Sequence, residues 1–204
     1  MSRGVGPHRR TRLRQSAVPT NLYDDALRVL GEWTAPTARG EAARRRFTTF
    51  LRANPGGTRR EHPGAHLTAS ALVVDAAAAR VLLCLHGRLH RWVQLGGHCE
   101  DADLSVAAAA LREATEESGI VGLVLSREPI DLDVHPVRCS GGDSLHYDVR
   151  YAAIAPAGAV EKLSDESADL RWFTPWELPS PLADATEPLV APALAWARGL
   201  ARGH

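Results

Sequence analysis

"GGHCEDADLSVAAAALREATEESGI", residues 96–120, is the stretch that decides the fold of this 204-residue chain. Two glycines are followed by an alanine-rich run whose apolar residues have helical spacing, and this predicts a helix over residues 105–118. Asp103 is placed as its N-cap, and Gly119 is the residue expected just past its end. The stretch therefore predicts a glycine turn that leads into one helix with an acidic C-terminal end.

Three glutamates lie on one face of this predicted helix. Glu113, Glu116 and Glu117 stand at positions i, i+3 and i+4, so their carboxylates come within reach of a common point. Like charges at this spacing repel, and acids near a helix C-terminus also oppose the helix dipole. A hard divalent cation would offset that repulsion through oxygen ligands, and Arg112 is placed to orient the carboxylates. The alternative is an ordinary solvated helix end.

The rest of the chain predicts strands on both sides of this helix and further helices at the two ends. Two helices are expected at residues 21–33, with Asn21 as N-cap, and 37–53, and a closing helix at 184–201. Short apolar or alternating runs predict strands at residues 67–75, 80–86 (paired with the first), 91–97, 120–125, 130–137, 145–155 and 169–175. Because regular β-α-β alternation is missing, this order indicates an α+β fold with a mixed sheet.

Composition narrows the class of protein. The 24 Lys and Arg balance the 24 Asp and Glu, so nucleic acid is an unlikely partner, and no apolar run is long enough for a membrane span. Residues 1–20 are predicted to be a disordered basic tail, 21–60 an N-terminal helical extension and 61–204 the main domain. The extension is expected to pack on the domain or on a second subunit, as in a homodimer. Three scattered cysteines fit a cytoplasmic setting.

The segment "REATEESGI", residues 112–120, resembles the second half of the Nudix hydrolase signature, Arg-Glu-apolar-x-Glu-Glu-x-Gly-apolar, at every position. The first half departs from the signature, because Asp103 replaces its glutamate and the spacing to Arg112 is one residue longer. In the family that glutamate helps to hold the loop and the helix together, and Asp103 either does the same or acts only as a cap. The resemblance covers about residues 65–179 and implies a Nudix-type α/β/α sandwich around a mixed sheet, with the helical extension outside it.

The resemblance also implies a chemistry. The family hydrolyses a diphosphate linkage by attack of water on phosphorus, with Mg²⁺ or Mn²⁺ as the cofactor. Carried over by position, Glu113, Glu116 and Glu117 bind one or more of these ions. The Gly96 carbonyl is expected to add a ligand, and Glu100 is a further candidate.

A general base is still needed. Glu117 is one candidate, and Glu166 in "LSDESADLRWF" is the other, with Asp165 as its runner-up. The alternative for Glu166 and Asp165 is a capping role in a turn. The expected catalytic residues are therefore Glu116, Glu117, Glu166 and Arg112.

Four residues are predicted to contact the substrate. His98 lies inside "GGHCE" and is expected to touch a substrate phosphate, as is Arg91. Trp92 and Tyr147 are expected to stack on a base, with core packing as the alternative. By family analogy the predicted substrate is a small nucleoside diphosphate derivative, ADP-ribose-like or a dinucleotide. The alternatives are a nucleoside triphosphate pyrophosphatase and a catalytically silent, nucleotide-binding regulatory protein.

Overall fold

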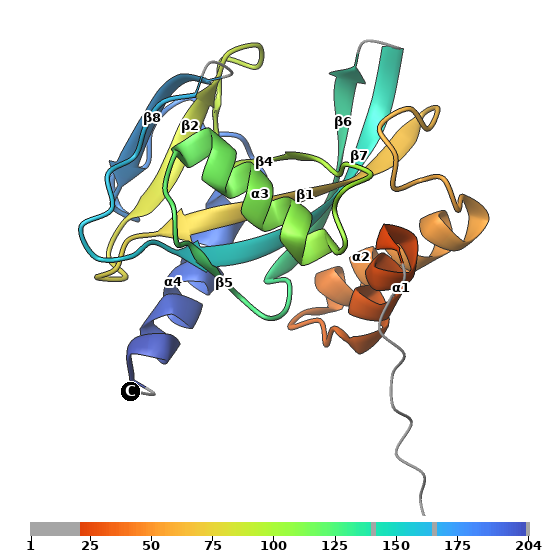
Figure 1. Ribbon diagram of the computed structural model, residues 1–204, viewed down its shortest axis with the longest axis horizontal. Helices are drawn as coiled ribbons and strands as arrows, with labels where there is room; N and C mark the ends of the chain where they lie inside the picture. Colours follow the sequence, from red (N-terminus) through yellow and green to blue (C-terminus); the bar gives the residue numbers. More distant parts are fainter. Residues whose placement is uncertain (1–20, 140–141, 165–166, 203–204) are drawn as a thin grey trace, which may run out of the picture.

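The central strand is β1 (Ala65–Val74), which pairs with three other strands of one mixed sheet. The computed structural model describes residues 21–139, 142–164 and 167–202. In these ranges the other strands are β2 (Val81–His86), β3 (Trp92–Val93), β4 (Leu95–His98), β5 (Val124–Leu125), β6 (Asp131–Cys139), β7 (Gly142–Ile154) and β8 (Ser167–Phe173). β1 runs parallel to β7 and antiparallel to β2 and β4, which confirms the predicted mixed sheet (Figure 1).

The chain changes partner within the segment predicted as one strand at residues 91–97. β3 pairs with β2, where Trp92 lies opposite Leu85. β4 pairs with β1 instead, where Gly96 lies opposite Ser70. The segment is therefore two short strands, and β4 carries the glycines against the middle of the sheet.

Each face of the sheet packs against helices, because side chains of a strand alternate between its two faces. Leu67, Ala69, Ala71 and Val73 of β1 belong to a core that includes residues of α3 (Val106–Ser118). On the opposite face, Leu72 and Val74 pack with apolar residues of α4 (Glu187–Arg202). Helices on both faces of a mixed sheet confirm the predicted α/β/α arrangement (Figure 1).

The ends of α3 differ from the prediction at one residue. Its N-cap is Ser105, whose hydroxyl accepts a hydrogen bond from the backbone N–H of Ala108 at 3.0 Å, so the prediction of Asp103 as N-cap is wrong. The carboxylate of Asp103 is engaged elsewhere, as described below. Gly119 has φ 66°, a left-handed conformation that glycine adopts without strain, and it ends the helix as predicted.

The N-terminal helices α1 (Leu22–Glu32) and α2 (Ala38–Ala53) pack on the α3 side of the sheet. Asn21 caps α1 as predicted, since its side chain accepts from the N–H of Asp24 at 3.0 Å. The buried carboxylate of Asp25 accepts from the N–H of Val106, at the first turn of α3, at 2.8 Å. Of the two predicted positions, packing on the domain is the one observed, and α1 helps to fix the start of α3.

Some expectations fall on residues outside the described ranges. These are the basic tail at 1–20 and the candidate bases Asp165 and Glu166. Among the described residues, no helix is both long enough and apolar enough to span a membrane.

Candidate active site

The glycines of β4 lie directly against the glutamates of α3. The backbone N–H of Gly96 donates a hydrogen bond to the carboxylate of Glu117 at 2.8 Å. A Cβ atom at Gly97 would lie 2.8 Å from the carboxylate carbon of Glu113. The glycines therefore allow β4 to come close enough for both carboxylates to line the same corner.

Arg112 ties this corner together. One guanidinium nitrogen, Nη1, lies 3.1 Å from a carboxylate oxygen of Glu113 and 3.1 Å from one of Glu116. The other, Nη2, donates to the carbonyl oxygen of His98 at 2.9 Å and to Asp103 at 3.0 Å. These hydrogen bonds, above all the one to Asp103, raise the pKa of Arg112, so it stays charged. Two of the three glutamate carboxylates are thus held side by side by one cation.

Asp103 joins the longer loop to the helix. Its carboxylate accepts from Nε and Nη2 of Arg112 and from the backbone N–H of Glu100, at 3.1, 3.0 and 2.8 Å. Only 6% of its side chain is exposed. Of the two roles left open by the sequence, it is the one that holds the loop and the helix together, since Ser105 is the cap.

Asp103→Ala should therefore destabilise the fold. Breaking a buried ion pair costs several kcal/mol, but Arg112 keeps its other carboxylate partners, so we expect a loss of about 2–3 kcal/mol in the free energy of unfolding. Urea unfolding monitored by circular dichroism measures it. Asp103→Asn keeps the shape and one acceptor oxygen, so it should lose less. Equal stability of Asp103→Ala and wild type would contradict this role.

A cleft of about 1470 Å³ opens over this corner. The predicted site residues among those that line it are Gly96, His98, Glu100, Arg112, Glu113, Glu116 and Glu117. Asn21 and Tyr23 at the start of α1 and Arg59 and Arg60 in the loop after α2 also line it. No local pattern predicts this second group, because the packing that brings the extension to the cleft is long-range.

The other predicted substrate residues lie elsewhere. Tyr147 is buried and stacks on Phe50 at a centroid distance of 4.2 Å, which fixes α2 to the sheet. Trp92 is also buried and meets Phe173 edge-on at 4.9 Å. Arg91 reaches the carbonyl oxygen of Leu182 at 3.3 Å. The structure therefore places Tyr147 and Trp92 in the core, which was the alternative to base stacking. Neither of them, nor Arg91, belongs to the described cleft wall.

A buried polar network lies on the α4 side of the sheet. The carboxylate of Asp148 accepts hydrogen bonds from the hydroxyls of Thr68 and Ser70, at 3.2 and 2.8 Å, and from Nε of Arg150 at 3.0 Å. Arg150 is 1% exposed and also donates to Asp133 at 3.1 Å. Polar residues stand at every second position of these strands, and this alternation is the sequence signal that would have predicted a polar face of the sheet.

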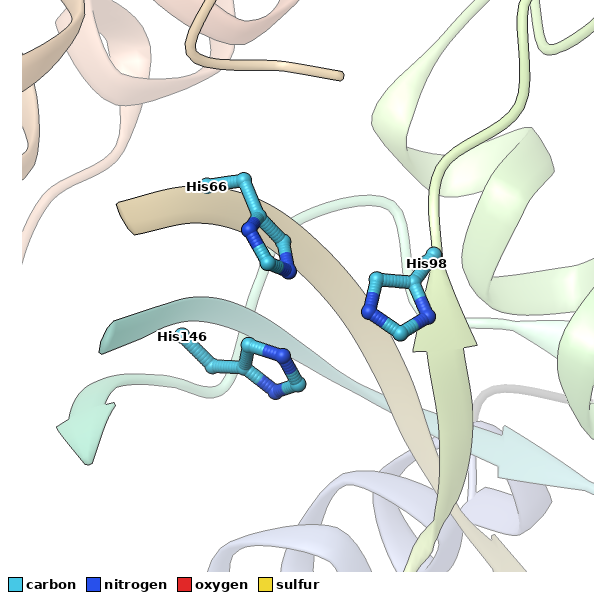
Figure 2. A group of neighbouring side chains, drawn as sticks. All are labelled: His66, His98 and His146. Carbon is cyan, nitrogen blue, oxygen red and sulfur yellow. The ribbon is translucent and has the colours of Figure 1, made fainter. Parts of the chain in front are cut away.

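The same face carries a histidine cluster, which consists of His66, His98 and His146 (Figure 2). Ring centroids are 4.7 to 5.1 Å apart, and one ring nitrogen from each lies within 4.8 Å of the others. Burial lowers the pKa of His98 to about 4 and that of His146 to about 3, and it also lowers the pKa of His66. Positively charged neighbours, Arg60 among them, act in the same direction. At neutral pH the cluster is uncharged.

Stability should consequently fall in mild acid. The unfolded chain takes up protons on these histidines near pH 6.5 while the folded chain does not, so it binds more protons below that pH. The free energy of unfolding should drop as the pH falls from about 6.5 to about 4, by up to about 1.4 kcal/mol per pH unit for each histidine. Urea unfolding in a chelating buffer measures this slope. His146→Gln should flatten it, and an unchanged slope in this variant would contradict the shift.

Comparison with known proteins defines the class. The model of the NUDIX domain matches residues 64–196, which is more than half of the chain. The chain therefore belongs to the Nudix family, as its resemblance to the signature implied. Among curated protein sequences none matches it.

Solved structures agree on the fold. A Nudix-family hydrolase from Clostridium perfringens has 23% identity and a TM-score of 0.51, and the match covers 66% of this chain and 97% of that one. The Ap4A hydrolase of C. elegans has 18% identity and a TM-score of 0.52, with 65% and 98% covered. The NUDIX domain of Shewanella oneidensis NrtR, solved with ADP ribose, has 21% identity and a TM-score of 0.50, with 72% and 97% covered. At these identities the similarity defines the fold alone.

Proposed function

We propose that this protein is a Mg²⁺- or Mn²⁺-dependent hydrolase of a diphosphate linkage in a nucleoside diphosphate derivative, ADP-ribose-like or a dinucleotide. The observation that carries the proposal is the corner where Glu113, Glu116 and Glu117 meet the glycines of β4 at the cleft. Its donors are carboxylate oxygens, which hard divalent cations prefer. Membership of the Nudix family supports the same reaction.

The three glutamates would hold the ion, with the carbonyl of Gly96 and the carboxylate of Glu100 as further ligands. When bound, such an ion neutralises phosphate oxygens and lowers the pKa of a bound water. Arg112 keeps Glu113 and Glu116 side by side beforehand, because both accept from the same nitrogen. The chain thus holds these two mutually repelling carboxylates in place before an ion arrives.

Glu117 is our candidate for the group that takes the proton from the attacking water. Its carboxylate is oriented by the N–H of Gly96 at 2.8 Å, and a general base has to be fixed in this way to work. Glu166 remains the second candidate. The two are separated by the pH dependence of kcat in Glu117→Gln and Glu166→Gln, because only loss of the base removes the acidic limb.

The size and charge of the cleft support a substrate larger than a nucleoside monophosphate. Its volume of about 1470 Å³ exceeds that of common small-molecule pockets, about 300–1,000 Å³. Arg59, Arg60 and Arg88 line it together with the glutamates, so it offers both a cation site and positive side chains. Phosphates that bridge the two would suit a substrate with a nucleoside on one side and a second group on the other. His98 lines the same cleft and remains our candidate contact to a phosphate.

A nucleotide panel with product identification tests the proposal. ADP-ribose, diadenosine polyphosphates and nucleoside triphosphates are incubated with the full chain, with and without Mg²⁺, and the products are separated by ion-exchange chromatography. We expect Mg²⁺-dependent release of a nucleoside monophosphate and a second phosphorylated product. Pyrophosphate from triphosphates alone would favour the pyrophosphatase alternative, and tight binding without turnover would favour the regulatory one.

Gly97→Ala should weaken metal binding while the fold survives. The new methyl group would lie 2.8 Å from the Glu113 carboxylate, which must swing away, and the swing removes a metal ligand. We expect about 10-fold to 100-fold weaker Mn²⁺ binding, measured by electron paramagnetic resonance. Gly199→Ala in α4 is the matched control, since no atom lies within 4 Å of its added Cβ. Equal Mn²⁺ affinity in both variants would show that Glu113 does not depend on the close approach.

A further inference from the structure

The histidine cluster lies where three strands meet. His66 of β1 is opposite His146 of β7, and Thr68 of β1 is opposite His98 of β4, which puts His98 diagonally across from His66. Residues two apart on a strand share a face, so the three imidazoles project from the same side of the sheet. Figure 2 shows the rings turned toward a common space. The backbone register thus holds three potential nitrogen ligands together without any loop.

Two of these side chains are left with unused polar atoms. His66 is 1% exposed, and neither of its ring nitrogens has a hydrogen-bonding partner among the residues that the structure describes. The Nε2 atom of His98 is also buried, and it too has no hydrogen-bonding partner among the described residues. Buried polar atoms without a partner cost free energy, and they are rare unless a ligand satisfies them. The cluster is therefore arranged for something that accepts imidazole lone pairs.

We propose that His66, His98 and His146 form a binding site for a divalent transition-metal ion such as Zn²⁺. The site is distinct in its donor atoms from the carboxylates of α3. Three imidazole nitrogens favour Zn²⁺, Co²⁺ or Ni²⁺, whereas Mg²⁺ prefers oxygen. Three histidines would leave the fourth position of a tetrahedral ion open to the cleft, which His98 and His146 line.

The distances fit with small side-chain movements. A tetrahedral Zn²⁺ with Zn–N bonds of about 2.0–2.1 Å separates its ligand nitrogens by about 3.4 Å. The nitrogens here already lie within 4.8 Å of one another, so each separation has to shorten by no more than about 1.4 Å to reach that value. His135 lies beside the cluster, 5.6 Å from the ring of His146, and its Nδ1 is paired with Asp133 at 2.9 Å. Asp133 thus holds His135 at the edge of the cluster, and His135 is not one of the three proposed ligands.

An anion is the competing ligand, and the protonation state opposes it. Burial keeps these rings neutral at pH 7, so the cluster offers an anion no positive charge, although a single neutral ring such as that of His98 can still donate one N–H to a phosphate. Neutral imidazole is the form that ligates a metal. The geometry and the unpartnered nitrogens carry the proposal, and the neutral rings agree with it.

Co²⁺ is the probe that tests the site, because four- or five-coordinate Co²⁺ absorbs visible light much more strongly than the six-coordinate ion. The full chain, freed of metal with a chelator, is titrated with Co²⁺ in the presence of excess Mg²⁺. We expect one equivalent to give an intense visible band that Zn²⁺ displaces and Mg²⁺ does not. No intense band, or a band that Mg²⁺ removes, would overturn the proposal.

Variants locate the ion. His98→Gln and His146→Gln should each weaken Co²⁺ binding by about 100-fold or more, because each removes a ligand. His90→Asn, at an exposed histidine outside the cluster, is the matched control and should keep the band. The double variant Glu113→Gln/Glu116→Gln should keep it as well, and its loss there would place the ion at the carboxylates and overturn the proposal.

Folding is checked independently of the metal. Circular dichroism and thermal midpoints in chelator show whether each variant is folded, and His98→Gln, at the end of β4, carries the test if His146→Gln is not. Zn²⁺ should raise the thermal midpoint of wild type and His90→Asn but not that of His98→Gln. Equal Zn²⁺ shifts in all three would overturn the site. None of these readouts uses turnover, so the result stands apart from the hydrolase proposal.

Discussion

Glu116→Gln should lower kcat at saturating Mg²⁺ by about 10²- to 10³-fold and leave the fold intact. The substitution replaces a charged oxygen ligand by a neutral amide of the same shape. Because 60% of the Glu116 side chain is exposed, little packing depends on it, and its partner Arg112 keeps Glu113 and Asp103. Steady-state kinetics on the substrate that the panel identifies, with Mg²⁺ titrated at each substrate concentration, measures the effect.

A matched control shows whether the effect comes from the position of Glu116 or from the loss of any surface carboxylate. Glu41→Gln removes a carboxylate from α2 that pairs with Arg44 and Arg45 and is no part of the described cleft wall, so it should leave kcat unchanged. Mn²⁺ binding should weaken in Glu116→Gln and stay the same in Glu41→Gln. If Glu116→Gln keeps the wild-type kcat and Mn²⁺ affinity, Glu116 is not a ligand of the proposed ion.

Gly96→Ala should destabilise the fold by about 3 kcal/mol or more. A Cβ atom at this position would lie 2.5 Å from the Cα of Ser70 and 2.7 Å from the carbonyl oxygen of Ala69. Both belong to β1, which pairs along its length with β7 and cannot move aside. The φ of 155° adds strain, since side chains other than glycine's rarely adopt it. Urea unfolding monitored by circular dichroism measures the loss.

Gly31→Ala is the control for this variant. Gly31 is exposed in α1 with no atom within 4 Å of an added Cβ, so the substitution should stabilise by about 0.5–1 kcal/mol through helix propensity. A Gly96→Ala protein as stable as wild type would mean that β4 can leave β1 without cost. The glycines would then have no role in bringing β4 close to the three glutamates of α3.

Local patterns predicted what depends on local structure. Helical spacing was enough to place α3 and the three acids on one face, and Gly119 was placed correctly because a left-handed residue commonly ends a helix. Asp103 was misplaced as a cap because a short acid before a helix fits two roles. Its actual partner, Arg112, lies nine residues further on and reaches back over the loop.

What the sequence could not supply are contacts between segments far apart. Tyr147 and Trp92 are aromatic residues near the glycine turn or in a strand, and only the docking of α2 and of Phe173 decides that they are core residues. The histidine cluster needs β1 and β7 to be parallel neighbours, although 80 residues separate His66 from His146. The alternation of residues within either strand does not indicate which strand pairs with it.

Hydrolysis in H₂¹⁸O tests the central claim most directly, because it asks whether the chain splits a diphosphate by attack of water on phosphorus. The wild-type protein is incubated with Mg²⁺ and the substrate of the panel that it cleaves fastest, and the masses of the products are measured by mass spectrometry. We predict one ¹⁸O atom in one of the two phosphorylated products, and no product without the metal. An intact nucleotide, bound but uncleaved with Mg²⁺ or Mn²⁺ present, would contradict the account.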